Sequence, residues 1–282
     1  MRAPTRRHIG YAVPVPNREY GANPPTPSLA DVARVLAEEA GMSLGGGLDP
    51  ALGAGVERAA AALATDLGVF VRRVVERDPA AIAALVEHAA VLETAFWRHP
   101  EQLAALARAA ASRAGPMRIW SAGCATGEEA YSVAIALLEA GRCSAGDTIV
   151  ATDVSVRGLH AARAAVYGER ALRWLPAALG ERWLEPGALR RVAAEVRALV
   201  TFERHNLVRD PPPAAAPFDV VLCRNVLIYF TPETAATVLY RLVAALAPGG
   251  FLVLGPVELP LARALELEWV TDGGATLLRR PR

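Results

Sequence analysis

Hydrophobic side chains along the first third of the sequence recur at spacings of three and four residues. The stretches 29–40 (LADVARVLAEEA) and 69–78 (VFVRRVVERD) place their apolar positions on one face of a helix. Ser28, directly before the first stretch, is typical of a helix N-cap because its hydroxyl can accept a bond from a free backbone N–H. We therefore expect a small all-helical domain over 29–113.

The pattern changes after Gly115 and Pro116, where short apolar runs of strand length begin to alternate with helical segments. The strand candidates are 117–122, 148–153, 199–206, 218–225, 251–255, 267–270 and 276–280, and helical patterns cover 128–140, 156–167 and 233–246. Strands that alternate with helices in this way form a parallel sheet. We expect an α/β fold over 114–282, with a Rossmann-like, mostly parallel, doubly wound sheet and a short insert near 185–201.

The overall composition indicates a globular protein and limits its partners. Hydrophobic residues make up 53% of the 282 residues and charged residues 21%, whereas the formal net charge is only +1. A charge this small provides no global attraction to nucleic acid or anionic lipid. Residues 1–28 are rich in proline and polar residues, so we expect a disordered N-terminal arm there.

Cysteine usage and the lack of long apolar runs bear on the compartment. Cys124, Cys143 and Cys223 are widely spaced and form no C-x-x-C pair, so we expect a reduced, cytoplasmic setting and no zinc site. The histidines lack metal-ligand spacing, and we expect no metal of any kind. No stretch of about 18 uncharged apolar residues occurs, so we expect neither secretion nor direct membrane insertion.

A glycine-containing turn follows the first strand candidate and leads directly into a helix. In SAGCATGEE, Gly123 and Gly127 allow a ligand to approach the backbone closely. No lysine follows Gly127, which excludes a P-loop, and the acidic pair Glu128 and Glu129 at the helix N-terminus would repel a pyrophosphate. A cationic ligand is tolerated there. S-adenosylmethionine, which carries a sulfonium and an ammonium group, meets that condition.

The second strand candidate ends in Thr152 and Asp153. A carboxylate at the C-terminal edge of such a strand can accept hydrogen bonds from both ribose hydroxyls of a nucleoside. The alternative is that Asp153 caps the helix that begins near Ser155, and the residues alone leave both interpretations open.

Several of these segments, taken in order, resemble one family. The runs RIWSAGCATGEEAYS, ATDVS, HNL and FDVVLCRNVLIYF, with TAFWRHP upstream, strongly resemble the CheR family of protein-glutamate methyltransferases from about Leu29 to Glu258. The resemblance implies a class I methyltransferase sheet preceded by a helical domain, with S-adenosylmethionine as cofactor. It also implies a protein acceptor, a chemoreceptor-like cytoplasmic helical domain whose glutamate carboxylates receive the methyl group.

The resemblance also assigns roles to individual residues. The cofactor-binding residues that it implies are Thr94, Arg98, Gly123, Glu129, Asp153, Asn206, Leu207, Asn225 and Val226, with Asn206 and Leu207 beside the adenine. The catalytic residues that it implies, near the transferred methyl group, are Arg98 and Tyr229. Each assignment has a simpler structural alternative: Asn206 could end its strand, Leu207 could be core, Asn225 could cap a turn, and Tyr229 could pack under the following helix.

Two departures from the family pattern concern the acceptor. The stretch 54–68 (AGVERAAAALATDLG) stands where the family has a basic helix, yet it holds Arg58 beside Glu57 and Asp66. Pro256 and Val257 stand where the family has polar side chains before the glutamate, which predicts an altered rim of the site.

These departures leave other functions open. The chain could methylate a different protein or a small molecule, or it could be a regulatory module that binds the cofactor without catalysis. DNA methylation is disfavoured, because CRNVLIYF replaces an N/D-P-P-Y type segment and no basic face is available to hold phosphates.

Overall fold

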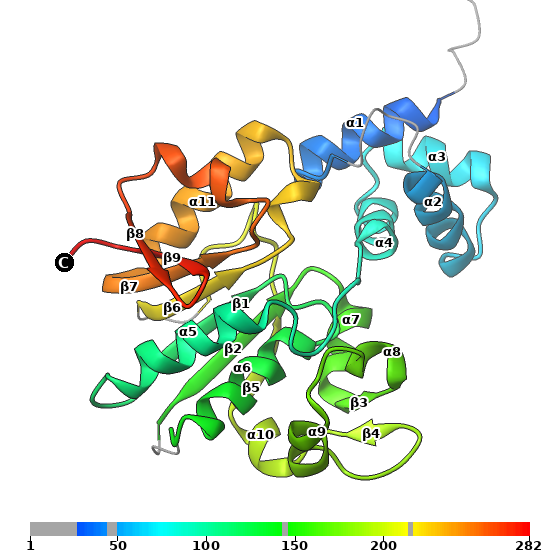
Figure 1. Ribbon diagram of the computed structural model, residues 1–282. Coiled ribbons are helices and arrows are strands. Elements are labelled where there is room, and N and C mark those ends of the chain that lie inside the picture. The colour runs from blue at the N-terminus through cyan, green and yellow to red at the C-terminus, as the bar shows by residue number, and fades with distance from the viewer. Residues whose placement is uncertain (1–26, 44–49, 143–145, 214–216) are drawn as a thin grey trace, which may run out of the picture.

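The computed structural model describes residues 27–43, 50–142, 146–213 and 217–282. The arm expected over 1–28 lies outside these ranges except for Pro27 and Ser28, and so does Cys143. A group of helices near the N-terminus lies beside an α/β sheet (Figure 1). None of the helices in the described ranges combines the length and apolar character that crossing a bilayer requires.

The helical group consists of four helices. They are α1 (Leu29–Ala40), α2 (Pro50–Ala62), α3 (Leu67–Val75) and α4 (Pro79–Ala89). Ser28 caps α1 as expected: its hydroxyl accepts a bond from Asp31 N at 3.3 Å, and the Asp31 carboxylate accepts one from Ser28 N at 3.0 Å. The buried apolar faces of all four helices form one core, with Phe70 and Leu85 at its centre.

Helix α5 (Pro100–Ala111) belongs to the sheet rather than to this helical group. Its buried side chains Leu103 and Leu106 pack with residues of the sheet and of α6 (Glu128–Glu139). The expected helical domain ran to residue 113, but the core that α1 to α4 share ends with Ala89. Helical periodicity predicted the buried face of α5 but not the surface that covers it.

The main sheet has seven strands in the order β5-β2-β1-β6-β7-β9-β8. The strands are β1 (Arg118–Ala122), β2 (Thr148–Asp153), β5 (Val200–Arg204), β6 (Phe218–Cys223), β7 (Leu246–Leu254), β8 (Glu268–Asp272) and β9 (Ala275–Arg279). β5, β2, β1, β6 and β7 run parallel, whereas β9 is antiparallel to both β7 and β8. The predicted mostly parallel, doubly wound sheet is confirmed.

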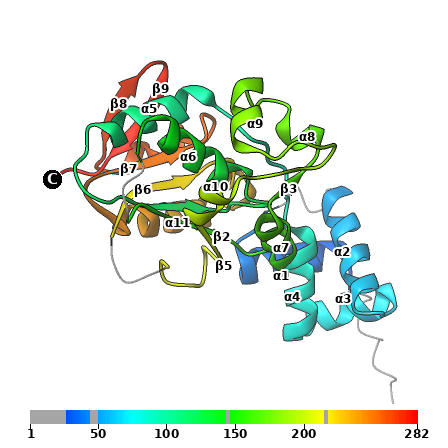
Figure 2. The same cartoon turned by 90° about the horizontal axis from the view of Figure 1, so that it is seen from below.

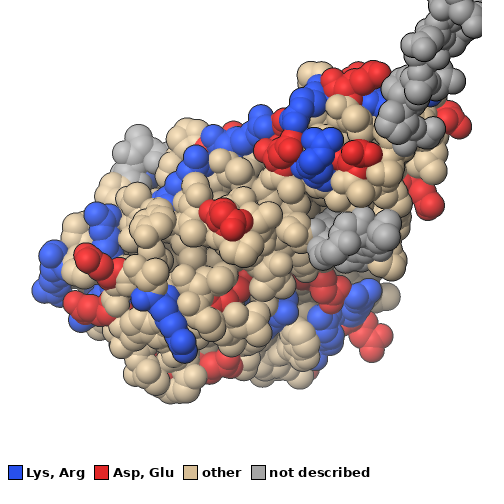
Figure 3. Space-filling view, turned by 90° about the horizontal axis from the view of Figure 1, so that it is seen from above, with Lys and Arg blue, Asp and Glu red and all other residues tan. Residues whose placement is uncertain are grey.

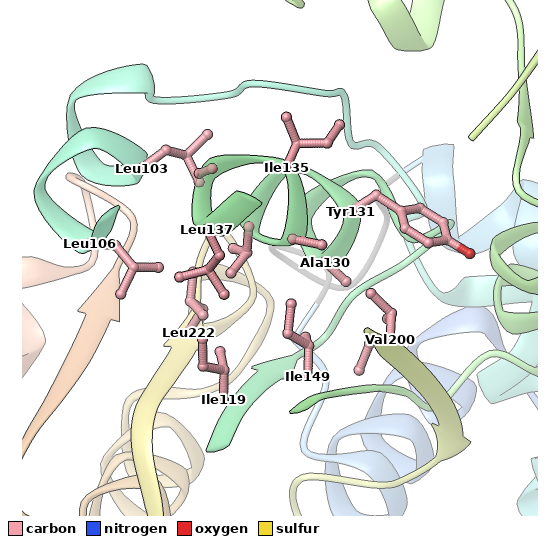
Figure 4. Packing of buried hydrophobic residues seen from close by; sticks show 14 of the residues in the cluster. Leu103, Leu106, Ile119, Ala130, Tyr131, Ile135, Leu137, Ile149, Val200 and Leu222 are labelled. Atoms are coloured by element: carbon pink, nitrogen blue, oxygen red, sulfur yellow. The ribbon is translucent and has the colours of Figure 1, made fainter. Parts of the chain in front are cut away.

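Helices cover both faces of this sheet (Figures 1 and 2). On one face, Ile119, Ile149 and Leu222 pack beneath α5 and α6, and Figure 4 shows Leu137 of α6 pointing toward these strands. On the other face, residues of β1, β6 and β7 pack against α11 (Pro232–Ala244) and the 3-10 helix η2 (Leu259–Ala264). Both faces are buried, which explains why the strands read as nearly continuous apolar runs.

The strand order reverses between β1 and β6. From β1 the chain proceeds outward to β2 and β5 on one side, and later to β6 and β7 on the other. Crossover loops diverge at such a point and leave a crevice outside the C-terminal ends of the strands, where ligands of open α/β sheets bind. The fold therefore locates a candidate site before any side chain is considered.

The insert expected near 185–201 is part of a longer subdomain. After α7 (Val156–Ala164), the strand β3 (Val166–Tyr167) pairs in antiparallel fashion with β4 (Arg190–Arg191). The short helices α8 (Glu169–Leu172) and α9 (Ala177–Trp183) lie between these strands, and α10 (Ala194–Ala198) follows them. The insert is thus a small two-stranded unit, and its first strand precedes the expected start.

Candidate active site

The largest part of the candidate site is a hollow at the crevice between β1 and β6. It encloses about 770 Å³ of empty space, part of it open to solvent, which falls within the size range of small-molecule sites. Eight of the residues predicted from sequence line it: Thr94, Arg98, Gly123, Glu129, Asp153, Asn225, Val226 and Tyr229. A second, adjoining hollow is lined by the other two, Asn206 and Leu207, and shares Gly123, Asp153 and Val226 with the first. The fold thus brings all ten together.

Gly123 lies where the loop after β1 meets the loop after β6. Its φ is +85°, in the left-handed region, and a Cβ atom built on it would lie 2.5 Å from the Val226 side chain. Any larger residue would therefore clash with Val226 and strain the backbone. The glycine is therefore required here by the packing of Val226, and close approach of a ligand to this backbone stays a prediction.

Asp153 ends β2 with its carboxylate held by two backbone amides. Its Oδ2 accepts a bond from Ala125 N at 2.8 Å, and its Oδ1 accepts one from Ser155 N at 2.9 Å. The N-cap of α7 is Ser155 rather than Asp153. Burial raises the pKa of the Asp153 carboxyl, and the two amide bonds act in the opposite direction. Asp153 faces the shared part of the two hollows and has no cationic side chain as a partner within the described residues.

Glu129, in the first turn of α6, belongs to a buried polar chain. Its Oε1 accepts a bond from the Ser121 hydroxyl at 2.7 Å, and its Oε2 accepts one from Arg224 Nε at 2.7 Å. Arg224 also donates to Gln102 Oε1 at 3.0 Å, and Gln102 donates to the carbonyl of Leu254 at 2.8 Å. Every charged group in this buried network of hydrogen bonds has a partner, because an unpaired buried charge is costly.

The loop after β6 is shaped by Glu258, which is fully buried. Its carboxylate accepts bonds from the backbone N–H groups of Asn225, Val226 and Leu227, each at 2.8 Å, and from Gly255 N at 2.9 Å. Asn225 has a φ of +60°, which asparagine tolerates better than most residues. Burial raises the pKa of the Glu258 carboxyl, against the opposing effect of the amide bonds. Glu258 thus fixes the two predicted cofactor residues Asn225 and Val226.

The altered rim expected at Pro256 and Val257 stays a prediction. Both side chains are exposed, with Val257 68% accessible, and neither lines the two hollows. The chain points them outward because the backbone here turns to bring Glu258 inward.

Arg98 and Tyr229 form the outer part of the main hollow. Within the described ranges, the Arg98 guanidinium has no hydrogen bond or ion pair, and the Tyr229 hydroxyl has no hydrogen bond. Burial raises the pKa of the Tyr229 hydroxyl, and the positive charge of Arg98 lowers it by less. The hydroxyl therefore remains a donor near neutral pH, beside an unpaired cation.

The charges around the main hollow fit a cationic ligand on one side. Glu93 at the rim pairs with Arg170 at 2.6 Å and Arg173 at 3.1 Å, and Glu129 pairs with Arg224. Among the carboxylates that line the hollow, only Asp153 then has no ion partner in the part of the chain that the structure describes. A nucleoside with a cationic sulfur centre suits this set better than an anionic phosphate compound does.

The helical group closes one side of the site. Met42 forms an antiparallel bridge with Phe230, and Ser43 N donates to the carbonyl of Tyr229 at 2.6 Å. On the adjoining side, Glu87 of α4 accepts bonds at the N-terminus of α7, from Val156 N at 2.7 Å and from the Ser155 hydroxyl at 2.7 Å. The site therefore requires both parts of the molecule.

Four functional neighbours were not singled out from sequence. Arg224, next to Asn225, had a usable signal, because an arginine that ends a buried strand needs a buried carboxylate partner. Gln102 and Glu87 act over long sequence separations, and Ser121, eight residues before Glu129, lies inside a strand whose apolar pattern does not mark it.

The cysteines and histidines add no chemistry to the site. Cys124 and Cys223 are buried, and burial raises the pKa of both thiols, which makes them poor nucleophiles. His205 lines the second hollow, where its Nε2 lies 2.8 Å from the carbonyl of Pro211. In the ranges that the structure covers, His, Cys, Asp and Glu side chains nowhere gather in threes that could hold a metal ion.

A seven-stranded doubly wound sheet with an antiparallel β9, and a hollow of this charge at its switch point, define the class I methyltransferase architecture. The family model described as CheR methyltransferase, SAM binding domain, matches residues 92–264. This match covers well over half of the chain, and the protein therefore belongs to the CheR methyltransferase family.

Three curated relatives show how far the similarity extends. Chemotaxis protein methyltransferase 2 of Pseudomonas aeruginosa is 39% identical over 192 residues, which cover 65% of this chain and 69% of that protein. The probable biofilm formation methyltransferase WspC of the same species is 38% identical over 193 residues, covering 65% and 46%. The chemotaxis protein methyltransferase of Klebsiella aerogenes is 37% identical over 171 residues, covering 58% and 59%. For the last two, the match spans less than two thirds of the relative.

Membership of this family identifies the protein as a methyltransferase of the CheR type that uses S-adenosylmethionine. The residues in the two hollows fit that cofactor by charge, because Asp153 lines both hollows without an ion partner among the described residues. The predicted fold, cofactor and enzyme class are thus confirmed. The acceptor and the roles of individual residues are matters for proposal.

Proposed function

We propose that this protein transfers the methyl group of S-adenosylmethionine to the side-chain carboxylate of a glutamate in a chemoreceptor-like signalling protein. One observation carries the proposal: the Arg98 guanidinium and the Tyr229 hydroxyl line the main hollow and have no polar partner in the described residues. A forked cation and a hydroxyl donor are the groups that can orient a carboxylate. The names of two relatives, both chemotaxis protein methyltransferases, support the same acceptor class.

The reaction asks little of the protein beyond orientation. When bound, S-adenosylmethionine supplies a methyl group on a positively charged sulfur. A glutamate side chain, with an ordinary pKa of about 4.3, is already an anion near pH 7 and needs no general base. Its oxygen attacks the methyl carbon: one C–O bond forms as the C–S bond breaks, and the bonding electron pair stays on sulfur. The products are a neutral methyl ester and S-adenosylhomocysteine, and no proton moves.

The side chains of this protein would then act in two sets. We assign Asp153 to the ribose hydroxyls, Asn206 and Leu207 to the adenine, and Glu129 to the ammonium end of the cofactor. Thr94, Gly123, Asn225 and Val226 would complete the cofactor pocket. Arg98 and Tyr229 would hold the acceptor carboxylate in line with the sulfonium and replace its water, which is the main source of rate in such a step.

A second candidate function is methylation of a different protein or of a small molecule. It is favoured by the surface of the helical group, where most of the arginines in the described residues are already engaged and Arg72 remains exposed. Arg58 of α2 donates to the carbonyl of His88, Arg73 pairs with Asp78, and Arg77 pairs with Glu38 and Glu39. On the face shown in Figure 3, basic and acidic side chains lie interspersed, without a field of one sign. The predicted cytoplasmic location stays a prediction for either acceptor.

The test combines a binding measurement with a transfer assay. Calorimetric titration with S-adenosylhomocysteine measures the cofactor site alone. Transfer of a radiolabelled methyl group is then measured on cytoplasmic fragments of chemoreceptors, with release of the label by base as the mark of an ester. A fragment in which the acceptor glutamates are replaced by alanine is the control.

Each result leads to a separate conclusion. Binding with base-labile incorporation supports the proposal, and binding without incorporation favours the second candidate function. Loss of S-adenosylhomocysteine binding altogether would contradict the assigned pocket.

A further inference from the structure

The segment that carries Arg98 adopts an unusual backbone conformation. Trp97 has a φ of +61° and His99 a φ of +59°, so a residue in the left-handed region lies on each side of Arg98. Neither is glycine, and side chains with a Cβ rarely adopt this conformation without support from their surroundings. Something outside the segment must therefore hold it in place.

Two bonds from the sheet domain provide that support. Trp97 N donates to the Ser132 hydroxyl at 2.9 Å, and Ser132 in turn donates to the carbonyl of Glu128, one turn earlier in α6, at 2.6 Å. Phe96 N donates to the carbonyl of Ala171, in α8 of the subdomain, at 2.8 Å. Of the two bonds, only the one from Trp97 uses a side chain that can be removed without altering the backbone.

Arg98 itself contributes nothing to its own placement. Its guanidinium makes no hydrogen bond or ion pair with any residue in the described ranges. A long, unpaired side chain samples many rotamers, so its mean position depends on where the backbone directs it. The backbone at Trp97, and hence the Ser132 hydroxyl, decides whether the guanidinium reaches into the hollow.

We propose that Ser132 is a positioning residue for the methyl transfer, which acts by fixing the backbone of Trp97 so that Arg98 reaches the acceptor carboxylate. Ser132 is 1% exposed and lines neither hollow, so it touches neither cofactor nor acceptor. The proposal rests on the proposed function for the role of Arg98. Misplacement of a reacting group by about 1 Å can reduce the rate on the order of 100-fold.

Ser132→Ala removes the hydroxyl and leaves α6 otherwise intact. We expect turnover to fall roughly ten-fold, while the dissociation constant of S-adenosylhomocysteine changes less than about two-fold. Thr237→Ala is the matched control, because Thr237 makes the same bond to a carbonyl four residues earlier, at 3.0 Å from Glu233 O, but holds no second segment. We expect it to leave both quantities unchanged.

A double variant separates positioning from general structural damage. If Ser132 acts through Arg98, Ser132→Ala should add less than about two-fold to the loss already caused by Arg98→Ala. A further ten-fold loss in that background would overturn the proposal. So would unchanged turnover in Ser132→Ala alone, or a loss of cofactor affinity equal to the loss of turnover.

Hydrogen exchange of the Trp97 amide, followed by NMR, tests the bond between Trp97 N and the Ser132 hydroxyl, which we call the anchor, and it requires no acceptor. We expect the exchange to be faster in Ser132→Ala and unchanged in Thr237→Ala. Should the wild type fail to methylate carboxylates, the proposed function fails, while the exchange rate still tells whether Ser132 holds Trp97. Unchanged exchange in Ser132→Ala would overturn the anchor itself.

Discussion

The two walls of the main hollow differ in how their polar groups are satisfied. The first wall comprises Asp153 and Glu129, with Glu258 supporting the loop after β6: Asp153 and Glu258 are held by backbone amides, and Glu129 is held by Ser121 and Arg224. The second wall comprises Arg98, which precedes α5, and Tyr229, which follows Val226; the Arg98 guanidinium and the Tyr229 hydroxyl have no polar partner in the residues that the structure describes. The first wall is complete in itself, whereas the second still offers hydrogen bonds to something else.

This difference separates recognition of the cofactor from recognition of the acceptor. Groups that are fixed during folding need no rearrangement when a ligand arrives, so the first wall is preorganised. Unpaired donors lose water only when a carboxylate replaces it, so the second wall responds to the acceptor. Substitutions in the two walls should therefore change different measured quantities.

The largest effect is expected from a substitution in the first wall. Asp153→Ala removes an acceptor that faces both hollows, and bonds to a charged group are worth roughly 1.5–3 kcal/mol each. We expect the affinity for S-adenosylhomocysteine, measured by calorimetry, to fall about 10- to 100-fold. Glu93→Ala is the control, since Glu93 lines the same hollow but is already paired with Arg170 and Arg173. Equal losses in both variants would show that the two walls do not differ as proposed.

A smaller effect, on turnover alone, is expected from a substitution in the second wall. Tyr229→Phe should lower turnover about ten-fold, because it removes one hydrogen bond from a neutral hydroxyl to a charged carboxylate. The cofactor affinity should stay within about two-fold of the wild type. Because burial raises the pKa of Tyr229, the wild type should keep its activity until the pH exceeds about 10, the ordinary pKa of tyrosine. Tyr240→Phe, at an exposed position, is the control. Full turnover in Tyr229→Phe would remove this hydroxyl from the mechanism.

The smallest effect concerns the stability of the first turn of α6, which carries Glu129. Glu128 starts the same helix as Glu129 but is buried with only the Thr126 hydroxyl, at 2.6 Å, as a side-chain donor. Burial raises its pKa, so the folded state binds the proton more readily than the unfolded state does. The stability that Glu128 contributes is therefore present below its ordinary pKa, near 4.5, and is lost as the pH rises through the raised value.

The glutamine of Glu128→Gln cannot titrate, so this variant does not lose stability through residue 128 as the pH rises. We therefore expect the free energy of unfolding of Glu128→Gln, minus that of the wild type, to increase between about pH 4 and pH 8. Urea unfolding at several pH values measures the difference. Glu233→Gln, at an exposed position in the first turn of α11, should show no such trend. A constant difference between Glu128→Gln and the wild type would contradict the raised pKa.

Local sequence signals predicted most of the fold. The strands of the main sheet and the helices between them follow from apolar runs and helical periodicity, because these elements bury whole faces. The packing of α5 on the sheet was missed, because the pattern of an amphipathic helix predicts which face is buried but not which element covers that face. The subdomain was underestimated because β3 and β4 have two residues each, too few for any periodicity.

The candidate site was predictable where it depends on strand ends. Gly123 and Asn225 follow β1 and β6, Asp153 ends β2, and a parallel sheet must bring such positions together at one edge. The supporting contacts were not predictable, because Gln102 and Arg224 are 122 residues apart in sequence, and Ser132 and Trp97 are 35 apart. Only the folded chain reveals these pairs.

Glu87 has a practical consequence for where the chain can be divided. The region that matches the family model begins at residue 92, downstream of Glu87. A fragment cut at that boundary would keep every strand of the sheet, yet Val156 N, Arg157 N and the Ser155 hydroxyl would lose the carboxylate that now accepts their bonds. The start of α7 adjoins Asp153 through Ser155 N, so the damage would reach the nucleoside pocket. The smallest autonomous catalytic piece of this protein should therefore include α4, although the match to the family model begins after that helix.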